Sequence, residues 1–259
     1  MADVTDAAFR FIIAKHSKGG EGAPLHSFVM FTEFTSADGL VLAPKERRKK
    51  LLKNLEYSEI ERPIVAQFFT SKPKNMEKVA QLAVELGFDG VDINMGCPDR
   101  TVEKQGAGAA LIKNPKLARE LIRAAKKGVN DEIPVSVKTR LGYNKDELET
   151  WLPELLAENP AAITVHARTR KEMSKMPARW ERVKRAVEIR DTETPPNSPP
   201  DQGREYKREI ADDLPLLHKE RPARFELRSK SGGSRRSPSE VLILGNGDVL
   251  SVPDAINKC

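Results

Sequence analysis

The sequence predicts a parallel α/β fold, either a (β/α)8 barrel or a doubly wound sheet. The expected strands are short and almost wholly apolar, which is typical of strands covered on both faces. Between them lie segments whose apolar residues recur every three or four positions, as in amphipathic helices. The length of 259 residues suits one large domain or two small ones, and an α/β barrel is typically about this size.

The chain before residue 60 is predicted to contain a helix, a buried strand and a basic helix. The first helix begins near Thr5 or Asp6, either of which can cap it, and it places Phe9, Ile12 and Ile13 on one face. The strand and the basic helix are expected at residues 28–34 and 45–53. The basic run is most simply a solvated helix face, with a phosphate-contacting surface as the alternative.

Strands and helices alternate regularly from residue 63 onward. Gly87 is expected just past the end of one helix, whereas Asn114 and Pro115 open the next and Gly128 stops it. The predicted strands are residues 63–69, 90–97, 134–140, 161–168 and 241–248. The predicted helices are residues 73–86, 114–128, 147–157 and 178–190.

Residues 191–240 interrupt this alternation. The segment is rich in proline and in charges of both signs, with few large apolar side chains. Such a composition cannot bury enough apolar surface to offset the entropy lost on ordering. We therefore expect a disordered insertion between a first barrel part, residues 1–190, and a last strand with the start of a helix, residues 241–259.

Each predicted strand from residue 63 onward ends in a polar side chain. These residues are Gln67, Asn94 with Cys97, Lys138 with Arg140, His166 with Arg168, and Asn246 with Asp248. Each has a simple structural explanation on its own, such as a core histidine or a surface lysine. The carboxyl ends of parallel strands meet at one edge, where βα folds bind ligands. Together these groups suit a flat, polar, partly anionic ligand, and Gly245-Asn246-Gly247 offers backbone N–H groups to a phosphate.

Composition restricts the function classes. The net charge of +6 is mildly basic and is compatible with a nucleic-acid partner. Cys97 and Cys259 form no CxxC pair, which favours a reducing compartment and argues against a structural zinc site. No apolar run approaches the ~18 residues of a membrane span, and no secretory signal is visible. We expect a cytoplasmic protein, with the nucleus as a second location, and no membrane or metal partner.

Cys97 has two interpretations from the residues alone. A free cysteine at a strand end is often just a small core residue. A nucleophilic pair with His166 is the alternative, but no acidic side chain that would orient the histidine is obvious.

The string Asp92-Ile93-Asn94-Met95-Gly96-Cys97-Pro98 resembles the signature of the flavin-dependent tRNA-dihydrouridine synthases. Five further motifs agree with that family in the same order. They are residues 1–10, Gln67, residues 137–142, residues 166–170 and residues 245–248. The resemblance covers residues 1–190 and 241–259.

The resemblance implies an FMN-binding TIM barrel that reduces a tRNA uridine to 5,6-dihydrouridine, with NADPH as electron donor. The family's general acid matches Cys97, and a thiol of ordinary pKa near 8.5 is mostly protonated at neutral pH and can donate. The expected cofactor-binding residues are Gln67, Asn94, Lys138, His166, Asn246 and Gly247. The expected contacts to tRNA phosphates or the target base are Lys104, Arg140 and Arg168.

The sequence departs from the family pattern at both ends. The family's first and eighth strands and its C-terminal helical domain, which grips tRNA, are not recognisable. We therefore expect an incomplete barrel in a truncated product that binds FMN poorly, and we expect no oligomer. Two other functions stay open: an FMN barrel oxidoreductase acting on a small enone or pyrimidine, and a non-catalytic RNA-binding remnant.

Overall fold

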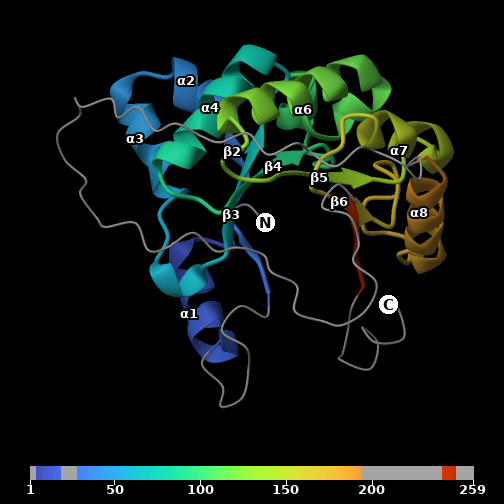
Figure 1. The fold of residues 1–259 in the computed structure, drawn as a ribbon, viewed down its shortest axis with the longest axis horizontal. Helices are drawn as coiled ribbons and strands as arrows, with labels where there is room; N and C mark the ends of the chain where they lie inside the picture. The colour runs from blue at the N-terminus through green and yellow to red at the C-terminus, as the bar shows by residue number, and fades with distance from the viewer. Residues whose placement is uncertain (1–3, 19–27, 194–240, 249–259) are drawn as a thin grey trace, which may run out of the picture.

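The computed structural model describes residues 4–18, 28–193 and 241–248, and within these ranges the strands form one seven-stranded parallel sheet (Figure 1). The sheet order is β1-β3-β4-β5-β6-β7, and β2 also pairs with β3. The strands are β1 (Met30–Phe31), β2 (Thr35–Ser36), β3 (Ile64–Phe69), β4 (Gly90–Asn94), β5 (Val135–Arg140), β6 (Ala162–His166) and β7 (Leu242–Asn246).

The helices cover one side of this sheet. Figure 1 shows α4, α6, α7 and α8 in a row along its outer side, while α1 lies apart from that row and contacts η1. The helices are α1 (Ala7–Lys18), α2 (Ala37–Leu42), α3 (Lys45–Lys53), α4 (Pro73–Glu85), α5 (Arg100–Lys104), α6 (Pro115–Val129), α7 (Leu148–Leu156) and α8 (Trp180–Glu193), with the short 3-10 helices η1 (Glu59–Glu61) and η2 (Gly108–Lys113).

The curled parallel sheet with helices outside it is part of a TIM-type barrel, as predicted. Among the described residues, β1 and β7 are the two end strands of the sheet order, so the barrel is open between them. The predicted alternation is confirmed from β3 to β7, and the actual strands are shorter than the predicted ones at one or both ends.

The two faces of the sheet differ in chemistry because successive strand residues point to opposite sides. Ala66, Val91, Ile93, Val137 and Ile163 are fully buried and belong to the main hydrophobic core. The alternate positions include the polar side chains Gln67, Asn94, Lys138 and His166, which the next subsection describes. The hydrophobic effect therefore fixes the sheet against its helices and leaves the polar residues on the concave face.

Two local predictions need correction. The predicted strand at residues 28–34 is only two residues long, and a second short strand, β2, follows it at Thr35–Ser36. Helix α6 does not stop at Gly128 but continues to Val129 and is capped by Asn130 in the left-handed conformation, with φ 48°. Gly128 has a different role, because an added Cβ there would lie 2.2 Å from the Glu77 carbonyl oxygen of α4.

Helix α1 is capped by Asp6, whose Oδ1 accepts a hydrogen bond from the Phe9 backbone N–H at 2.8 Å. The face that this helix buries is not the apolar one. Arg10 and Ala14 are buried, and Arg10 Nε lies 2.7 Å from Glu61 Oε2. Phe9, Ile12 and Ile13 are exposed.

The basic helix α3 has no buried residue, which agrees with a solvated face. The predicted insertion at residues 191–240 falls mostly outside the described residues. Its first three residues continue α8, which ends at Glu193.

Candidate functional site

The carboxyl ends of β3 to β7 bring the polar strand-end residues to one side of the sheet. Asn94 is paired in register with Lys138, and His166 is in register with both Arg140 and Asn246. Lys138 Nζ donates to Asn246 Oδ1 at 3.2 Å, from β5 across to β7. The strand ends therefore form one polar surface on the concave face, as the sequence predicts.

Cys97 lies in the middle of the loop between β4 and α5. Its backbone N–H donates to Asn94 Oδ1 at 2.9 Å, and its carbonyl oxygen accepts from the Ala109 N–H at 2.9 Å. Gly108 has φ +60°, and an added Cβ there would lie 2.7 Å from the Cys97 carbonyl oxygen. The backbone at Cys97 is thus fixed from two sides, by the Asn94 side chain before the loop and by the backbone of Gly108 and Ala109 in η2.

The Cys97 side chain is half-buried against a small cluster that includes Phe69, Val102 and Ala107. Burial raises the pKa of the thiol above its ordinary value, although the Asp99 backbone N–H and the Arg140 guanidinium oppose the rise. The thiol is therefore protonated at neutral pH. A protonated, half-buried thiol is suited to donate a proton and poorly suited to attack as a nucleophile.

The amides of Gln67 and Asn94 are joined to each other and to a buried carboxylate. Asn94 Nδ2 donates to Gln67 Oε1 at 3.0 Å, and Gln67 Nε2 donates to Asp92 Oδ2 at 2.7 Å. Each amide NH2 group has two N–H donors, so one donor on each remains for a ligand. Asp92 was not predicted as a site residue; the signal was a carboxylate two positions before Asn94 in an apolar strand, which places both on one face.

Burial lowers the pKa of Lys138, and the Asp92 carboxylate opposes that shift. An ammonium group has three donors, of which Asn246 takes one. Lys138 therefore presents N–H donors, on a partly desolvated ammonium, to the concave side of the sheet.

His166 is held as a neutral imidazole. Burial lowers its pKa to about 3, and the positive charges of Arg140, Lys138 and Arg168 add to the shift. Arg168 Nη1 lies 3.1 Å from His166 Nε2. A guanidinium can only donate, so Nε2 is the acceptor and the ring proton is on Nδ1. Asp248 in turn holds Arg168 Nη2 at 2.5 and 2.6 Å.

The three predicted RNA-contacting residues differ in accessibility. Lys104 is exposed on α5. Arg140 is 8% exposed, and its guanidinium donates to the carbonyl oxygens of Gly96, Thr169 and Met173. Arg168 is 5% exposed and is bound by Asp248. Both arginines therefore tie loops together within the chain, and Lys104 is the one whose side chain reaches solvent.

A second loop contact was not predicted from the sequence. The Arg170 guanidinium pairs with the Glu103 carboxylate of α5. The Arg170 guanidinium also lies 5.2 Å from the centre of the Tyr143 ring, and Lys113 Nζ lies 4.1 Å from it. These contacts join the loops after β4, β5 and β6 on the side of the sheet where Cys97 lies.

Gly247 follows β7 with φ 119°, and its carbonyl oxygen accepts from Trp180 Nε1 at 3.1 Å. An added Cβ at Gly247 would come within 3.2 Å of His166 and Arg168 and within 3.0 Å of Ala178. A side chain there would therefore press against the histidine and arginine of the site, so glycine fits this position on both conformational and steric grounds.

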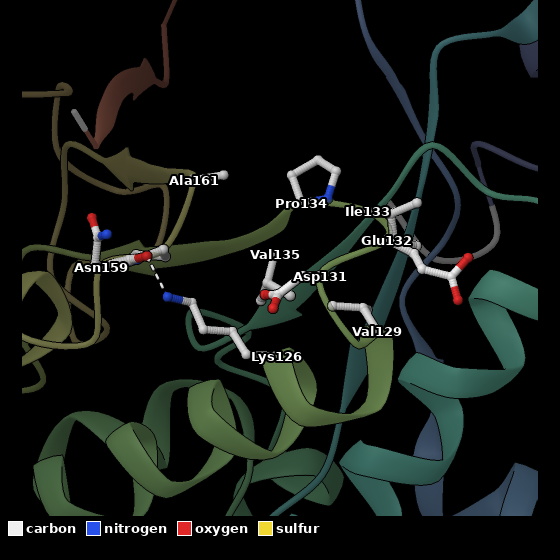
Figure 2. A pocket seen from close by; sticks show the side chains of 10 residues that line it. Lys126, Val129, Asp131, Glu132, Ile133, Pro134, Val135, Asn159 and Ala161 are labelled. Carbon is white, nitrogen blue, oxygen red and sulfur yellow. Dashed lines mark hydrogen bonds between the residues drawn. The ribbon is translucent and has the colours of Figure 1, made fainter. Parts of the chain in front are cut away.

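A hollow of about 360 Å³ lies at the other end of the strands (Figure 2). Asp131, Glu132, Pro134 and Asn159 are among its lining residues, and Lys126 Nζ donates across it to the Asn159 carbonyl oxygen at 2.6 Å. These residues precede β5 and β6. Because ligands of parallel βα folds bind at the carboxyl ends of the strands, we assign this hollow no part in the site.

In the part of the chain that the structure describes, no three His, Cys, Asp or Glu side chains gather as a metal site would require. Within the same ranges, no helix combines the length and the apolar content needed to cross a membrane.

Comparison with known proteins gives the family. The family model described as "Dihydrouridine synthase (Dus)" matches residues 1–190. The chain belongs to the dihydrouridine synthase family. It is 41% identical over 196 residues to the "Probable tRNA-dihydrouridine synthase 2" of Bacillus subtilis (strain 168), and the aligned residues make up 75% of this chain and 56% of that protein. It is 39% identical over 199 residues to the "Probable tRNA-dihydrouridine synthase" of Staphylococcus aureus (strain COL), with 76% and 56% covered.

The chain therefore spans about half the length of the curated dihydrouridine synthase relatives that it matches. The matched part holds the strands from β1 to β6 and the loop of Cys97. The resemblance stated from the sequence motifs is thereby confirmed. The roles of the individual site residues stay predictions, which the geometry above constrains.

Proposed function

We propose that this chain carries the catalytic surface of a tRNA-dihydrouridine synthase, which reduces a uridine of tRNA to 5,6-dihydrouridine. The observation that supports this most is the position of Cys97. Its thiol is half-buried and protonated, and its backbone is held by Asn94 at the edge of a surface of amide, ammonium and imidazole groups.

We propose FMN as the cofactor and NADPH as the electron donor. Enzymes of this family are flavin-dependent. The donor set supports a flavin: remaining N–H groups of Gln67 and Asn94 match a ring edge with several acceptors, and Lys138 matches negative charge on a ring or phosphate. His166 and Asn246 would complete the cradle. When bound, the flavin supplies the hydride that reduces the uracil ring.

The residues of the chain then act on the substrate as follows. Cys97 donates a proton from its Sγ to C5 of the uracil, and the raised pKa keeps that proton in place until it is needed. Arg140 holds the residue immediately before Cys97 through the Gly96 carbonyl oxygen. Lys104 contacts RNA phosphate from the exposed side of α5. A base buried in a stem or tertiary fold must be extruded to reach this surface.

The test uses the full chain, purified and mixed with FMN. Absorbance bands of bound flavin after gel filtration, with dihydrouridine formed in unmodified tRNA after addition of NADPH, would support the proposed function, and they would contradict the weak FMN binding predicted for an incomplete barrel. Cys97→Ala should retain the flavin and lose at least about a hundredfold in dihydrouridine formation, as general-acid catalysis typically contributes that much. Full activity of Cys97→Ala would contradict the proton-donor role.

Two other outcomes would favour the alternative functions. Reduction of free uridine as well as tRNA would indicate a small-molecule oxidoreductase. RNA binding without flavin binding, unchanged in Cys97→Ala, would indicate an RNA-binding remnant. The tRNA substrate agrees with the cytoplasmic or nuclear location that we propose, and a fluorescent fusion would test it.

A further inference from the structure

A continuous set of hydrogen bonds, fully buried at its two central members and partly buried at its ends, connects β5 to the loop of Cys97. Ser136 Oγ donates to Asp92 Oδ1 at 2.6 Å, and Gln67 Nε2 donates to the other oxygen of Asp92 at 2.7 Å. Asn94 Nδ2 donates to Gln67 Oε1 at 3.0 Å, and the N–H of Cys97 donates to Asn94 Oδ1 at 2.9 Å. We call this set the Asp92 relay.

Hydrogen-bond donors and acceptors along the relay can be arranged in only one way. A carboxylate can only accept, so the Gln67 amide must turn its NH2 group toward Asp92 and its oxygen toward Asn94. Backbone N–H groups can only donate, so Asn94 must turn its oxygen toward the loop. The two ends of the relay therefore agree on the orientation of both amides, which would otherwise be free to flip.

Burial makes this orientation costly to change. Asp92 is 0% exposed, and Gln67 and Asn94 are 8% and 7% exposed. Loss of the acceptor at Asp92 would leave a buried donor on Gln67 without a partner unless the amide reorients, and an unpaired buried donor is destabilising. Reorientation of Gln67 would in turn present a donor to Asn94 and weaken its hold on the loop.

We propose that Asp92 is a positioning residue that fixes, through two amide side chains, the loop that carries Cys97. The carboxylate touches neither the thiol nor the substrate surface directly. It decides which atoms of the amides face the ligand and how closely the thiol is held. This inference rests on the proposed role of Cys97, but its test does not need catalysis.

The experiment measures the alkylation rate of Cys97 by iodoacetamide against pH, in full chains that all carry Cys259→Ser so that Cys97 is the one thiol. In the parent chain the half-buried, raised-pKa thiol should react slowly. Asp92→Ala should react at least about fivefold faster at pH 8, with a titration midpoint shifted toward the ordinary thiol value near 8.5. Asp92→Asn, which keeps an acceptor for Gln67, should stay within about twofold of the parent.

A matched control is the neighbouring residue Val91. It is fully buried in the same strand but belongs to the core on the helix side. Val91→Ala should lower the free energy of unfolding without a change in alkylation beyond about twofold. Equal acceleration by Val91→Ala would overturn the proposal, because reactivity would then follow stability alone.

A double-mutant cycle separates a shared path from independent effects. Asn94→Ala should accelerate alkylation as Asp92→Ala does, and the double variant should be no faster than the faster single variant. Rates that multiply would overturn the relay.

If Asp92→Ala does not fold, Gln67→Met breaks the relay one step nearer the thiol and should give the same acceleration. Absence of dihydrouridine formation in the parent chain would count against the proposed function only, since alkylation reads the relay without flavin or tRNA.

Discussion

Asp92 shows how much one side chain can be altered by its surroundings. Burial raises the pKa of its carboxyl to about 6, against the opposing effects of Ser136, Gln67 and Lys138. The folded chain therefore holds this proton up to about pH 6, whereas the unfolded chain loses it near pH 3.8. The stability that the folded state gains from this group is present below about pH 4 and is lost as the pH rises through 6. The ionised form that the relay needs at neutral pH thus has a cost in stability.

We accordingly predict that Asp92→Asn is more stable than the parent chain at pH 7, by up to about 3 kcal/mol for two pKa units in a fully buried group. Asparagine retains an acceptor for Gln67 and a donor for Ser136, and carries no charge. Chemical denaturation at several pH values checks this, and the difference should vanish below about pH 4. An unchanged difference from pH 4 to pH 7 would contradict the pKa shift.

At the scale of elements, α4 and α6 pack so closely that one position must be glycine. A Cβ on Gly128 would lie 2.2 Å from the Glu77 carbonyl oxygen and 2.8 Å from Ala80 Cβ. Helix propensity alone favours alanine over glycine inside a helix by roughly 1 kcal/mol. Contact between the two helices should override that preference, because backbone atoms cannot move aside cheaply.

Gly128→Ala should therefore lower the free energy of unfolding by about 1–3 kcal/mol, as overpacking does. The matched control is Lys127→Ala, one position earlier on the same helix. Lys127 is 74% exposed and pairs with Glu77 at 2.9 Å, and its loss should change stability by less than about 1 kcal/mol. Denaturant unfolding of both variants checks the prediction. A stabilised Gly128→Ala chain would show that propensity, and not packing, decides this position.

At the scale of the whole molecule, apolar side chains gather where the described sheet and helices leave them uncovered. On α1, Phe9, Phe11, Ile12 and Ile13 are 44%, 44%, 54% and 39% exposed. On the concave side of β7, Leu242 and Leu244 are 48% and 38% exposed. Clusters of exposed apolar groups, such as the one on α1, bind hydrophobic dyes and promote association.

We expect the purified chain to enhance the fluorescence of 8-anilinonaphthalene-1-sulfonate (ANS) at neutral pH, without denaturant. Replacement of Phe9, Ile12 and Ile13 together by glutamine should remove about half of that signal, since α1 carries a large share of the uncovered apolar groups. The control replaces the exposed Lys45, Lys49 and Lys53 of α3 by glutamine and should leave the signal unchanged. No enhancement by the parent chain would contradict the prediction.

Local sequence was sufficient for most of the element pattern. Helix periodicity, the Asn114 cap of α6 and the apolar runs of β3 to β6 depend on near neighbours in the chain, so the sequence shows them directly. The face of α1 could not be predicted in this way. Its burial depends on the ion pair of Arg10 with Glu61, a partner 51 positions away.

The sequence by itself determined the parallel βα order, the family, and the polar groups at the carboxyl ends of the strands. Strand alternation and motif order are properties of the chain alone. The tertiary structure alone decided which of those groups remain available: Arg140 and Arg168 are committed to loop contacts, and Asp92 controls two amides. The reason is that hydrogen-bond partners on neighbouring strands are close in space and distant in sequence, and only the register of the sheet brings them together.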